Sequence, residues 1–283
     1  MNVLSLFDGI SCGQIALERA DIKVDTYYAS EIKDYAIKIT KHNYPDTIQL
    51  GDVKNINIEE FPKIDLLIGG SPCQDISNLS QNGKGIQGDK SGLFFEYLRL
   101  LKELKPKYFL LENVVGKKTS INTISKLLGV EPIKIDSRLL TAQKRQRYYW
   151  TNIPGIEQPI DKNIKLQDIL ETEVDEKYFL KNGRLKWVLG ENGQKCIVKR
   201  YASLDAEKAN CLTVRGEPSW NCNYVTQNGR IRKLTPIEYE RLQTVPDNYT
   251  SCVTDKYRYN VLGDGWTVDV IVHILKYINK NKI

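Results

Sequence analysis

The fold is decided by one stretch, Ile64-Asp65-Leu66-Leu67-Ile68-Gly69-Gly70-Ser71-Pro72-Cys73-Gln74. Its aliphatic half predicts a buried parallel strand, and the two glycines that follow predict a loop. In open α/β sheets, ligands and reacting groups lie at such strand ends. Pro72 fixes the backbone just before Cys73, so the thiol is held rigidly. Cys73 is therefore a candidate nucleophile; the alternative is a free cysteine buried as a small apolar side chain.

The start of the chain has a related pattern. Residues 2–7 predict a strand, the segment from Asp8 to Gly13 predicts a turn with two glycines, and residues 14–20 predict an amphipathic helix. Glycine lets the backbone approach a ligand closely, so this turn is a candidate cofactor site. Many α/β turns carry two glycines for folding reasons alone.

Two carboxylates follow this turn at the ends of predicted strands. The strand over residues 24–30 ends at Glu31, about twenty residues after the turn, where nucleotide-binding folds place an acid on ribose hydroxyls. The strand over residues 47–50 leads to Asp52, whose carboxylate is a candidate acceptor for an adenine amino group. This spacing fits a nucleoside ligand.

A second group of polar side chains follows the Cys73 strand. The predicted strand over residues 108–111 ends at Glu112, which can face the same crevice as Cys73. Arg145 and Arg147 alternate along a further predicted strand, so they are expected to share one face. The alternatives to functional roles are that Glu112 is a solvated carboxylate at a strand end and that the arginines protect an edge strand.

Composition excludes several classes of protein. The chain has 283 residues, enough for one large domain or a large and a small one. Its six cysteines form no Cys-x-x-Cys pair and it has two histidines, which argues against a zinc site or a disulfide framework. No apolar run approaches the roughly 18 residues of a membrane span. We expect a protein of a reducing cytoplasm.

The positive charge is concentrated in residues 181–233. This segment holds eleven Lys and Arg against four acids, an excess larger than the net charge of +6 for the whole chain. The basic residues are Lys181, Arg184, Lys186, Lys195, Lys199, Arg200, Lys208, Arg215, Arg230, Arg232 and Lys233. Aromatic and asparagine side chains are interleaved with them, a mixture that suits phosphate contacts and base-edge reading. An ordinary solvated face would have a similar excess of charge.

The chain resembles the DNA cytosine-5 methyltransferases over essentially its full length, because it contains their motifs in the order that the family has them. They are Phe7-Asp8-Gly9 with Gly13, Glu31, Gly51-Asp52-Val53, Pro72-Cys73-Gln74, Glu112-Asn113-Val114, Gln143-x-Arg145-x-Arg147, Arg232-x-Leu234-Thr235-Pro236 with Glu238-x-x-Arg241-Leu242-Gln243, and Gly263-x-Gly265-Trp266. Each motif alone is weak, but the ordered set is specific. The first and last motifs look like the branch with animal de novo enzymes and phage or bacterial relatives.

The resemblance implies an α/β fold, a doubly wound and mostly parallel sheet of the S-adenosylmethionine-dependent methyltransferase type with a small target-recognition domain. Residues 1–155 would form the catalytic and cofactor-binding domain, residues 156–233 the target-recognition domain, and residues 234–283 a segment that returns to the catalytic domain. The implied partner is double-stranded DNA, bound by a monomer without a metal or a membrane.

The resemblance also implies the roles of individual residues. Cys73 would add to cytosine C6, Glu112 would hydrogen-bond N3 and the exocyclic amine, and Arg145 and Arg147 would hold O2 and a neighbouring carboxylate or phosphate. S-adenosyl-L-methionine would supply the methyl group. The implied cofactor-binding residues are Phe7, Asp8, Gly9, Gly13, Glu31, Asp52, Pro72, Asp264 and Trp266.

Asp264 departs from the family pattern, which usually has asparagine or another polar or basic residue at this position. A carboxylate near a sulfonium raises the possibility of decarboxylated S-adenosylmethionine as the donor of an aminopropyl group. The motifs are also compatible with a transfer RNA cytosine-5 methyltransferase or with an inactive DNA-binding regulator. A nicotinamide oxidoreductase would share only the glycine turn and Glu31.

Overall fold

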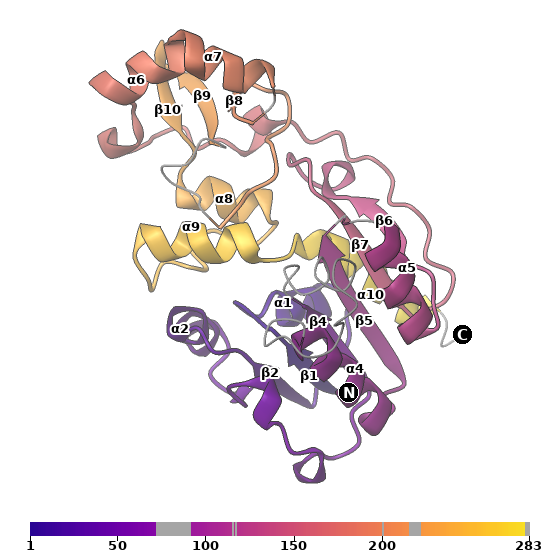
Figure 1. The fold of residues 1–283 in the computed structure, drawn as a ribbon. Coiled ribbons are helices and arrows are strands. Elements are labelled where there is room, and N and C mark those ends of the chain that lie inside the picture. Colours follow the sequence, from indigo (N-terminus) through magenta and orange to yellow (C-terminus); the bar gives the residue numbers. More distant parts are fainter. Residues whose placement is uncertain (72–91, 115, 117, 200, 215–221, 281–283) are drawn as a thin grey trace. The chain divides into compact units, whose positions relative to one another are not determined.

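This computed structural model describes residues 1–71, 92–114, 116, 118–199, 201–214 and 222–280, and the chain divides into two compact units (Figure 1). The first unit comprises Met1–Ile135, Gln146–Gln158 and Ile271–Ile283, and the second comprises Asp136–Arg145 and Pro159–Val270. These limits describe packing within the chain. The functional segments expected at residues 1–155, 156–233 and 234–283 stay a prediction.

The first unit is built on a seven-stranded sheet with the order β3-β2-β1-β4-β5-β7-β6. Its strands are β1 (Asn2–Leu6), β2 (Thr26–Ser30), β3 (Ile48–Gln49), β4 (Leu66–Gly70), β5 (Tyr108–Val114), β6 (Ile133–Asp136) and β7 (Gln146–Thr151). The pairs of β1 with β2 and β4, of β2 with β3, and of β4 with β5 are parallel, whereas β7 runs antiparallel to β5. The expected doubly wound, mostly parallel sheet is confirmed.

Helices cover both faces of this sheet. They are α1 (Cys12–Arg19), α2 (Asp34–Asn43), α4 (Gly92–Leu104), α5 (Lys118–Leu128) and α10 (Val268–Lys280), with short 3-10 turns at Val53–Asn55 and Ile58–Glu60. Phe94 of α4 and Ile124 of α5 share a core cluster with Leu67 of β4. Gly13 of α1 lies against Ile68, the next residue along β4. Because successive strand residues face opposite ways, α1 packs on the other face from α4 and α5.

The glycines after the apolar run continue β4 instead of ending it. Gly69 pairs with Leu6 and with Leu111, and Gly70 pairs with Glu112. A Cβ on Gly69 would lie 3.0 Å from the Leu6 carbonyl oxygen and 3.2 Å from the ring of Tyr97. The strand therefore needs glycine here because α4 packs so closely on it, and the expected loop begins later than the sequence indicated.

The second unit contains a three-stranded sheet of order β10-β9-β8, covered by two short helices (Figure 1). Its elements are 3-10 turns at Ser137–Leu139, Leu166–Ile169 and Glu176–Tyr178, helices α6 (Asn182–Leu189), α7 (Glu191–Val198), α8 (Pro236–Leu242) and α9 (Asp255–Asp264), and strands β8 (Ser203–Leu204), β9 (Asn223–Gln227) and β10 (Arg230–Lys233). A small core joins Val188 of α6 to Tyr224 of β9. This unit thus has an apolar centre of its own.

Two charged residues tie β10 to α8 in the second unit. The Arg232 guanidinium bonds both carboxylate oxygens of Glu238, at 2.8 and 2.6 Å, and both side chains are fully buried. Glu238 also accepts from the backbone N–H of Thr235, which completes a capping box at the start of α8. Removing one partner of such a buried pair leaves the other charge uncompensated.

Within the described residues, no helix combines the length and the apolar character that a membrane crossing requires. The same residues contain no cluster of three or more His, Cys, Asp and Glu side chains that could hold a metal ion.

Gly263 of α9 provides a test of packing in the second unit. A Cβ at this position would lie 2.2 Å from backbone atoms of Thr213, and those atoms can move only with the chain. We expect Gly263→Ala to reduce the free energy of unfolding by about 1–3 kcal/mol, the usual cost of overpacking. The measurement is the urea unfolding midpoint.

The matched control for this substitution is Gly183→Ala in α6, where an added Cβ meets no atom within 4 Å. Alanine favours a helix over glycine by up to about 1 kcal/mol, so this variant should be neutral or more stable. Equal midpoints for the two variants would contradict the proposed constraint.

Candidate active site

The turn after β1 has an unusual backbone. Phe7, Gly9 and Ser11 all have positive φ, at 56°, 62° and 57°. Glycine adopts this region without cost, whereas each of the other two residues stores about 1–2 kcal/mol of strain. Such strain persists only where surrounding contacts impose it, and it is concentrated at functional sites. The residues predicted to hold a cofactor therefore form a turn of imposed shape.

Glu31 supplies the contacts that impose this shape. One of its carboxylate oxygens accepts from the backbone N–H of Gly9 at 2.9 Å. The other accepts from the N–H groups of Ile32 and Lys33 at 2.8 and 2.9 Å. A carboxylate has about four acceptor positions, so three are used and one is left for a ligand hydroxyl. Glu31 joins the turn after β1 to the chain entering α2.

Beneath the same turn lies a polar network around Asp8. Its carboxylate accepts from the hydroxyls of Ser11 and Tyr27, the latter at 2.8 Å, and the Ser11 hydroxyl also lies 3.2 Å from that of Thr40. Loss of hydration raises the pKa of Asp8 above its ordinary value, and nearby Glu31 adds to this effect. Sequence reasoning singled out Asp8 but missed Tyr27 and Thr40, whose role depends on packing between elements.

Gly13 and Asp52 lie in different surroundings. Gly13 belongs to α1, where a Cβ would lie 2.5 Å from Ile68 Cδ1 and 2.6 Å from the Tyr27 hydroxyl. Close packing of helix on sheet thus accounts for this glycine. Asp52 accepts from the backbone N–H of Lys54 at 3.0 Å and opens a 3-10 turn. Cofactor binding by either residue stays a prediction.

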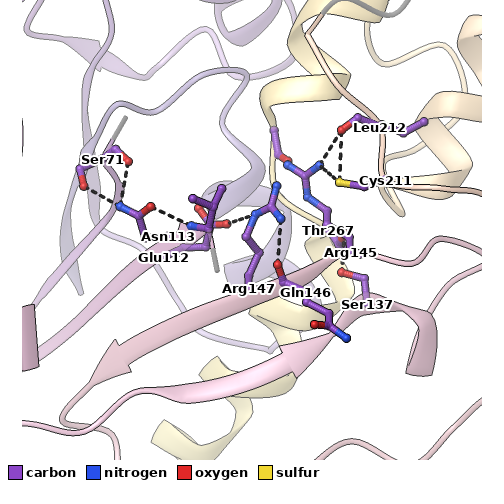
Figure 2. Close-up of polar contacts among 12 residues, drawn as sticks. Ser71, Glu112, Asn113, Ser137, Arg145, Gln146, Arg147, Cys211, Leu212 and Thr267 are labelled. Atoms are coloured by element: carbon purple, nitrogen blue, oxygen red, sulfur yellow. Dashed lines mark hydrogen bonds and ion pairs between the residues drawn. The ribbon is translucent and has the colours of Figure 1, made fainter. Parts of the chain in front are cut away.

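Glu112 of β5 and Arg147 of β7 form an ion pair between these two neighbouring strands. The Arg147 Nε lies 2.8 Å from a Glu112 carboxylate oxygen, and both side chains are largely buried, with exposures of 14% for Arg147 and 11% for Glu112 (Figure 2). The antiparallel register places Arg147 opposite Val114, so the ion pair runs diagonally across the two strands. The structure therefore brings together two of the four predicted catalytic residues.

Asn113 of β5 connects this strand to the end of β4. Its amide nitrogen donates to the carbonyl oxygen and to the hydroxyl of Ser71, both at 3.1 Å, and its amide oxygen accepts from the N–H of Val114 at 2.7 Å (Figure 2). Ser71 immediately precedes Pro72 and Cys73, which lie outside the described residues. The predicted strand ends at residue 111, whereas β5 continues to Val114 and includes Asn113, so these contacts of Asn113 were missed.

Arg145 differs from the expectation that it shares a strand with Arg147. It precedes β7, and its guanidinium donates to the carbonyl oxygens of Gly265 at 2.9 Å and Leu212 at 3.1 Å (Figure 2). Gly265 is the C-cap of α9, so a cation on its carbonyl stabilises the C-terminal end of this helix. The strand begins one residue later, at Gln146, so Arg145 lies just outside β7, and the expected common face stays a prediction. A catalytic role for Arg145 stays a prediction.

Asp264 and Trp266 belong to the second unit. Asp264 is the last residue of α9 and is exposed, and Trp266 is half-buried after it. Gly263 of the same motif is needed because α9 approaches the backbone at Thr213 closely. The predicted contact of Asp264 and Trp266 with a cofactor stays a prediction.

Comparison with protein families gives one model that matches residues 1–280, described as C-5 cytosine-specific DNA methylase. Among curated proteins, the chain is similar to the type II methyltransferase M1.ScrFI of Lactococcus lactis subsp. cremoris, with 31% identity over 99% of this chain and 79% of the relative. It is also similar to the type II methyltransferase M.NlaX of Neisseria lactamica, with 29% identity over 95% of this chain and 93% of the relative.

Two solved structures show the same fold at low sequence identity. The Entamoeba histolytica methyltransferase EhMeth matches 100% of this chain and 99% of its own with a TM-score of 0.82 and 19% identity. The Dnmt2 methyltransferase of S. pombe matches the same shares with a TM-score of 0.81 and 21% identity.

The hydrogen bonds of Glu31 predict how the isosteric substitution Glu31→Gln changes the free energy of unfolding. In Glu31→Gln an NH2 group replaces one carboxylate oxygen, so it must face either the Gly9 N–H or the N–H groups of Ile32 and Lys33. A buried donor without an acceptor costs about 1–3 kcal/mol, and we expect this loss in the free energy of unfolding. Thermal and urea unfolding measure it.

The control is Glu59→Gln, an exposed glutamate in a 3-10 turn of the same unit. Surface changes of this kind stay within about 0.5 kcal/mol. If Glu31→Gln were as stable as this control, the carboxylate would not impose the shape of the turn.

Proposed function

The chain belongs to the C-5 cytosine-specific DNA methylase family, and from that premise we propose that it transfers a methyl group from S-adenosyl-L-methionine to C5 of a cytosine in duplex DNA. The observation that carries the proposal is the buried ion pair of Glu112 with Arg147, at 2.8 Å, beside the β4 end that leads to Cys73. The bacterial relatives and the phage methyltransferases among the matches support a setting in the cytoplasm of a bacterial or phage-infected cell.

The first unit suits a nucleoside-bearing cofactor. The strained turn from Phe7 to Ser11 leads into α1, and Glu31 retains one acceptor position for a ribose hydroxyl. Phe7, the first residue of this turn, is partly exposed. Asp52 comes shortly after β3, the strand that pairs with β2. These residues would hold S-adenosyl-L-methionine, which supplies an electrophilic methyl group.

The residues of the chain would activate the cytosine ring. The Cys73 thiolate adds to C6 and converts the ring to an enamine whose C5 is nucleophilic. Glu112 hydrogen-bonds N3 and the exocyclic amine, gives a proton to N3 as C6 is attacked, and takes it back when Cys73 is eliminated. After methylation, loss of the C5 proton and elimination of Cys73 restore the aromatic ring. Arg147 keeps the Glu112 carboxylate in place throughout.

Asn113 supports this scheme as a positioning residue. Its two hydrogen bonds fix Ser71, and the proline that follows limits the backbone before Cys73. Asn113 follows Glu112 directly along β5, so one strand would orient the nucleophile and the acid together.

Duplex DNA would reach the protein through the basic segment of the second unit. A cytosine within a duplex hides C6, so the base must leave the stack at a cost of a few kcal/mol. Phosphate contacts from lysine and arginine supply most of the sequence-independent binding energy. The protein would act as a monomer, without a metal.

Covalent catalysis by Cys73 has a direct test. DNA with 5-fluorocytosine at the target should trap a covalent complex, because fluorine blocks the proton loss that releases the enzyme. We expect Cys73→Ala to form no complex and to transfer no methyl groups, as measured by denaturing electrophoresis and by mass spectrometry of nucleosides. Cys196→Ala is the control, since that cysteine lies in α7 of the second unit. Substantial methyl transfer by Cys73→Ala would refute the assignment.

Asp264 tests the choice of cofactor. Because its carboxylate is exposed, solvent screening weakens its influence on a nearby charge, and we expect Asp264→Asn to keep the same cofactor preference. The measurement is a competition between S-adenosylmethionine and its decarboxylated form, with products identified by mass spectrometry. Aminopropyl cytosine from the native protein, lost in Asp264→Asn, would instead support aminopropyl transfer.

A further inference from the structure

The second unit contains a cavity of about 520 Å³, a size within the range of small-ligand sites. Four basic side chains line it: Lys177, Lys181, Arg184 and Lys233. The residues lining it include no aspartate or glutamate. The cavity lies where the 3-10 turn at Glu176–Tyr178 and the start of α6 meet β9 and β10. Its chemistry is therefore that of an anion site.

Two tyrosine rings hold the basic groups at this cavity. The ammonium groups of Lys177 and Lys233 lie 4.9 and 5.3 Å from the centre of the Tyr178 ring. The Arg184 guanidinium lies 5.9 Å from the centre of the Tyr224 ring and donates from Nε to its hydroxyl at 2.9 Å. Cation–π contacts orient a charge without neutralising it. The cavity thus presents cations that are already placed.

The same rings argue against a site for a base. Tyr178 and Tyr224 are 8% and 1% exposed, so neither offers a face on which a base could stack. What the cavity offers to a ligand is positive charge and N–H donors. This combination fits a phosphate group better than a nucleobase.

Neighbouring basic residues show how the cavity differs from the rest of the segment. Arg230 is bound by Glu176, and Arg232 is buried against Glu238. Beside the cavity, the Asp255 carboxylate lies 2.9 Å from the Lys177 ammonium and 3.8 Å from the Arg258 guanidinium. Two of the arginines counted in the sequence are thus paired with carboxylates, whereas no acidic residue is among those that line the cavity.

We propose that this cavity binds one phosphate of the DNA backbone, with Lys181, Arg184 and Lys233 as its ligands. The proposal rests on the proposed function, which makes duplex DNA the partner of this protein. It narrows the expected DNA contact from the whole of residues 181–233 to three basic residues of that segment, because Lys177 at the same cavity is paired with Asp255. A free nucleotide offers the same phosphate chemistry, and the experiment separates the two sources.

The test uses the full-length protein and a fluorescently labelled duplex, with binding measured by anisotropy across a salt series. Each neutralised phosphate contributes about −0.9 to the slope of log K against log salt. The double variant Lys181→Gln/Lys233→Gln should flatten this slope by about 0.9 and weaken binding to duplexes of every sequence. The double variant Lys181→Arg/Lys233→Arg keeps the charges and should retain the slope.

The control is Lys256→Gln in α9, which removes a positive charge in the same unit. Its ammonium also lies over a tyrosine ring, that of Tyr257 at 5.9 Å, but outside the cavity. We expect the slope of this control to match that of the native protein. An equal slope for the native protein and Lys181→Gln/Lys233→Gln would overturn the proposal.

Competition with deoxycytidine monophosphate identifies the source of the phosphate. If millimolar nucleotide fails to displace the duplex, the result supports a site for the DNA backbone. If the nucleotide displaces the duplex from the native protein but not from the glutamine double variant, the cavity is a site for free nucleotides and the proposal is overturned. A flatter slope for Lys181→Gln/Lys233→Gln, together with no 5-methylcytosine from the native protein, would refute the proposed function and leave the phosphate site intact. Methylation with an unchanged slope would refute the phosphate site alone.

Discussion

The arrangement of the candidate site depends on one carboxylate, that of Glu31. Its bonds to the N–H groups of Gly9, Ile32 and Lys33 hold two strand ends of the parallel sheet together. Hydrogen bonds to a charged group contribute about 1.5–3 kcal/mol each, enough to offset a strained residue such as Phe7. Contacts within the chain therefore set the shape of the turn after β1, and a turn shaped in this way lowers the entropic cost of binding a ligand.

Positive charge in the second unit serves two purposes that the sequence does not distinguish. Arg232 and Glu238 are both fully buried, so this pair organises β10 and α8 and cannot meet a phosphate. Lys208 is also buried, with its ammonium on the carbonyl oxygen of Arg138. Counting lysines and arginines locates a basic segment, but burial decides which of them can contact DNA.

Strand patterns and motif order were enough to predict the doubly wound sheet and the turn after β1. They were not enough for Gly69, because its pairing with Leu6 and Leu111 shows that it continues β4, and both partners are distant in the sequence. Arg145 was placed on the strand of Arg147 by alternation, yet its carbonyl partners lie about 65 to 120 residues along the chain. Contacts between distant segments leave no local signal, and the same holds for Tyr27 beneath Asp8.

The first unit is assembled from three separate stretches, and the third of them begins at Ile271. Asn279 of α10 donates to the carbonyl oxygen of Ala20, so this helix packs beside the C-terminal end of α1. During synthesis, residues 1–135 must wait until the whole second unit has been translated before this contact can form. The growing chain therefore holds the turn after β1 in an unfinished unit for most of translation, and folding of the first unit is completed only after α10 has left the ribosome.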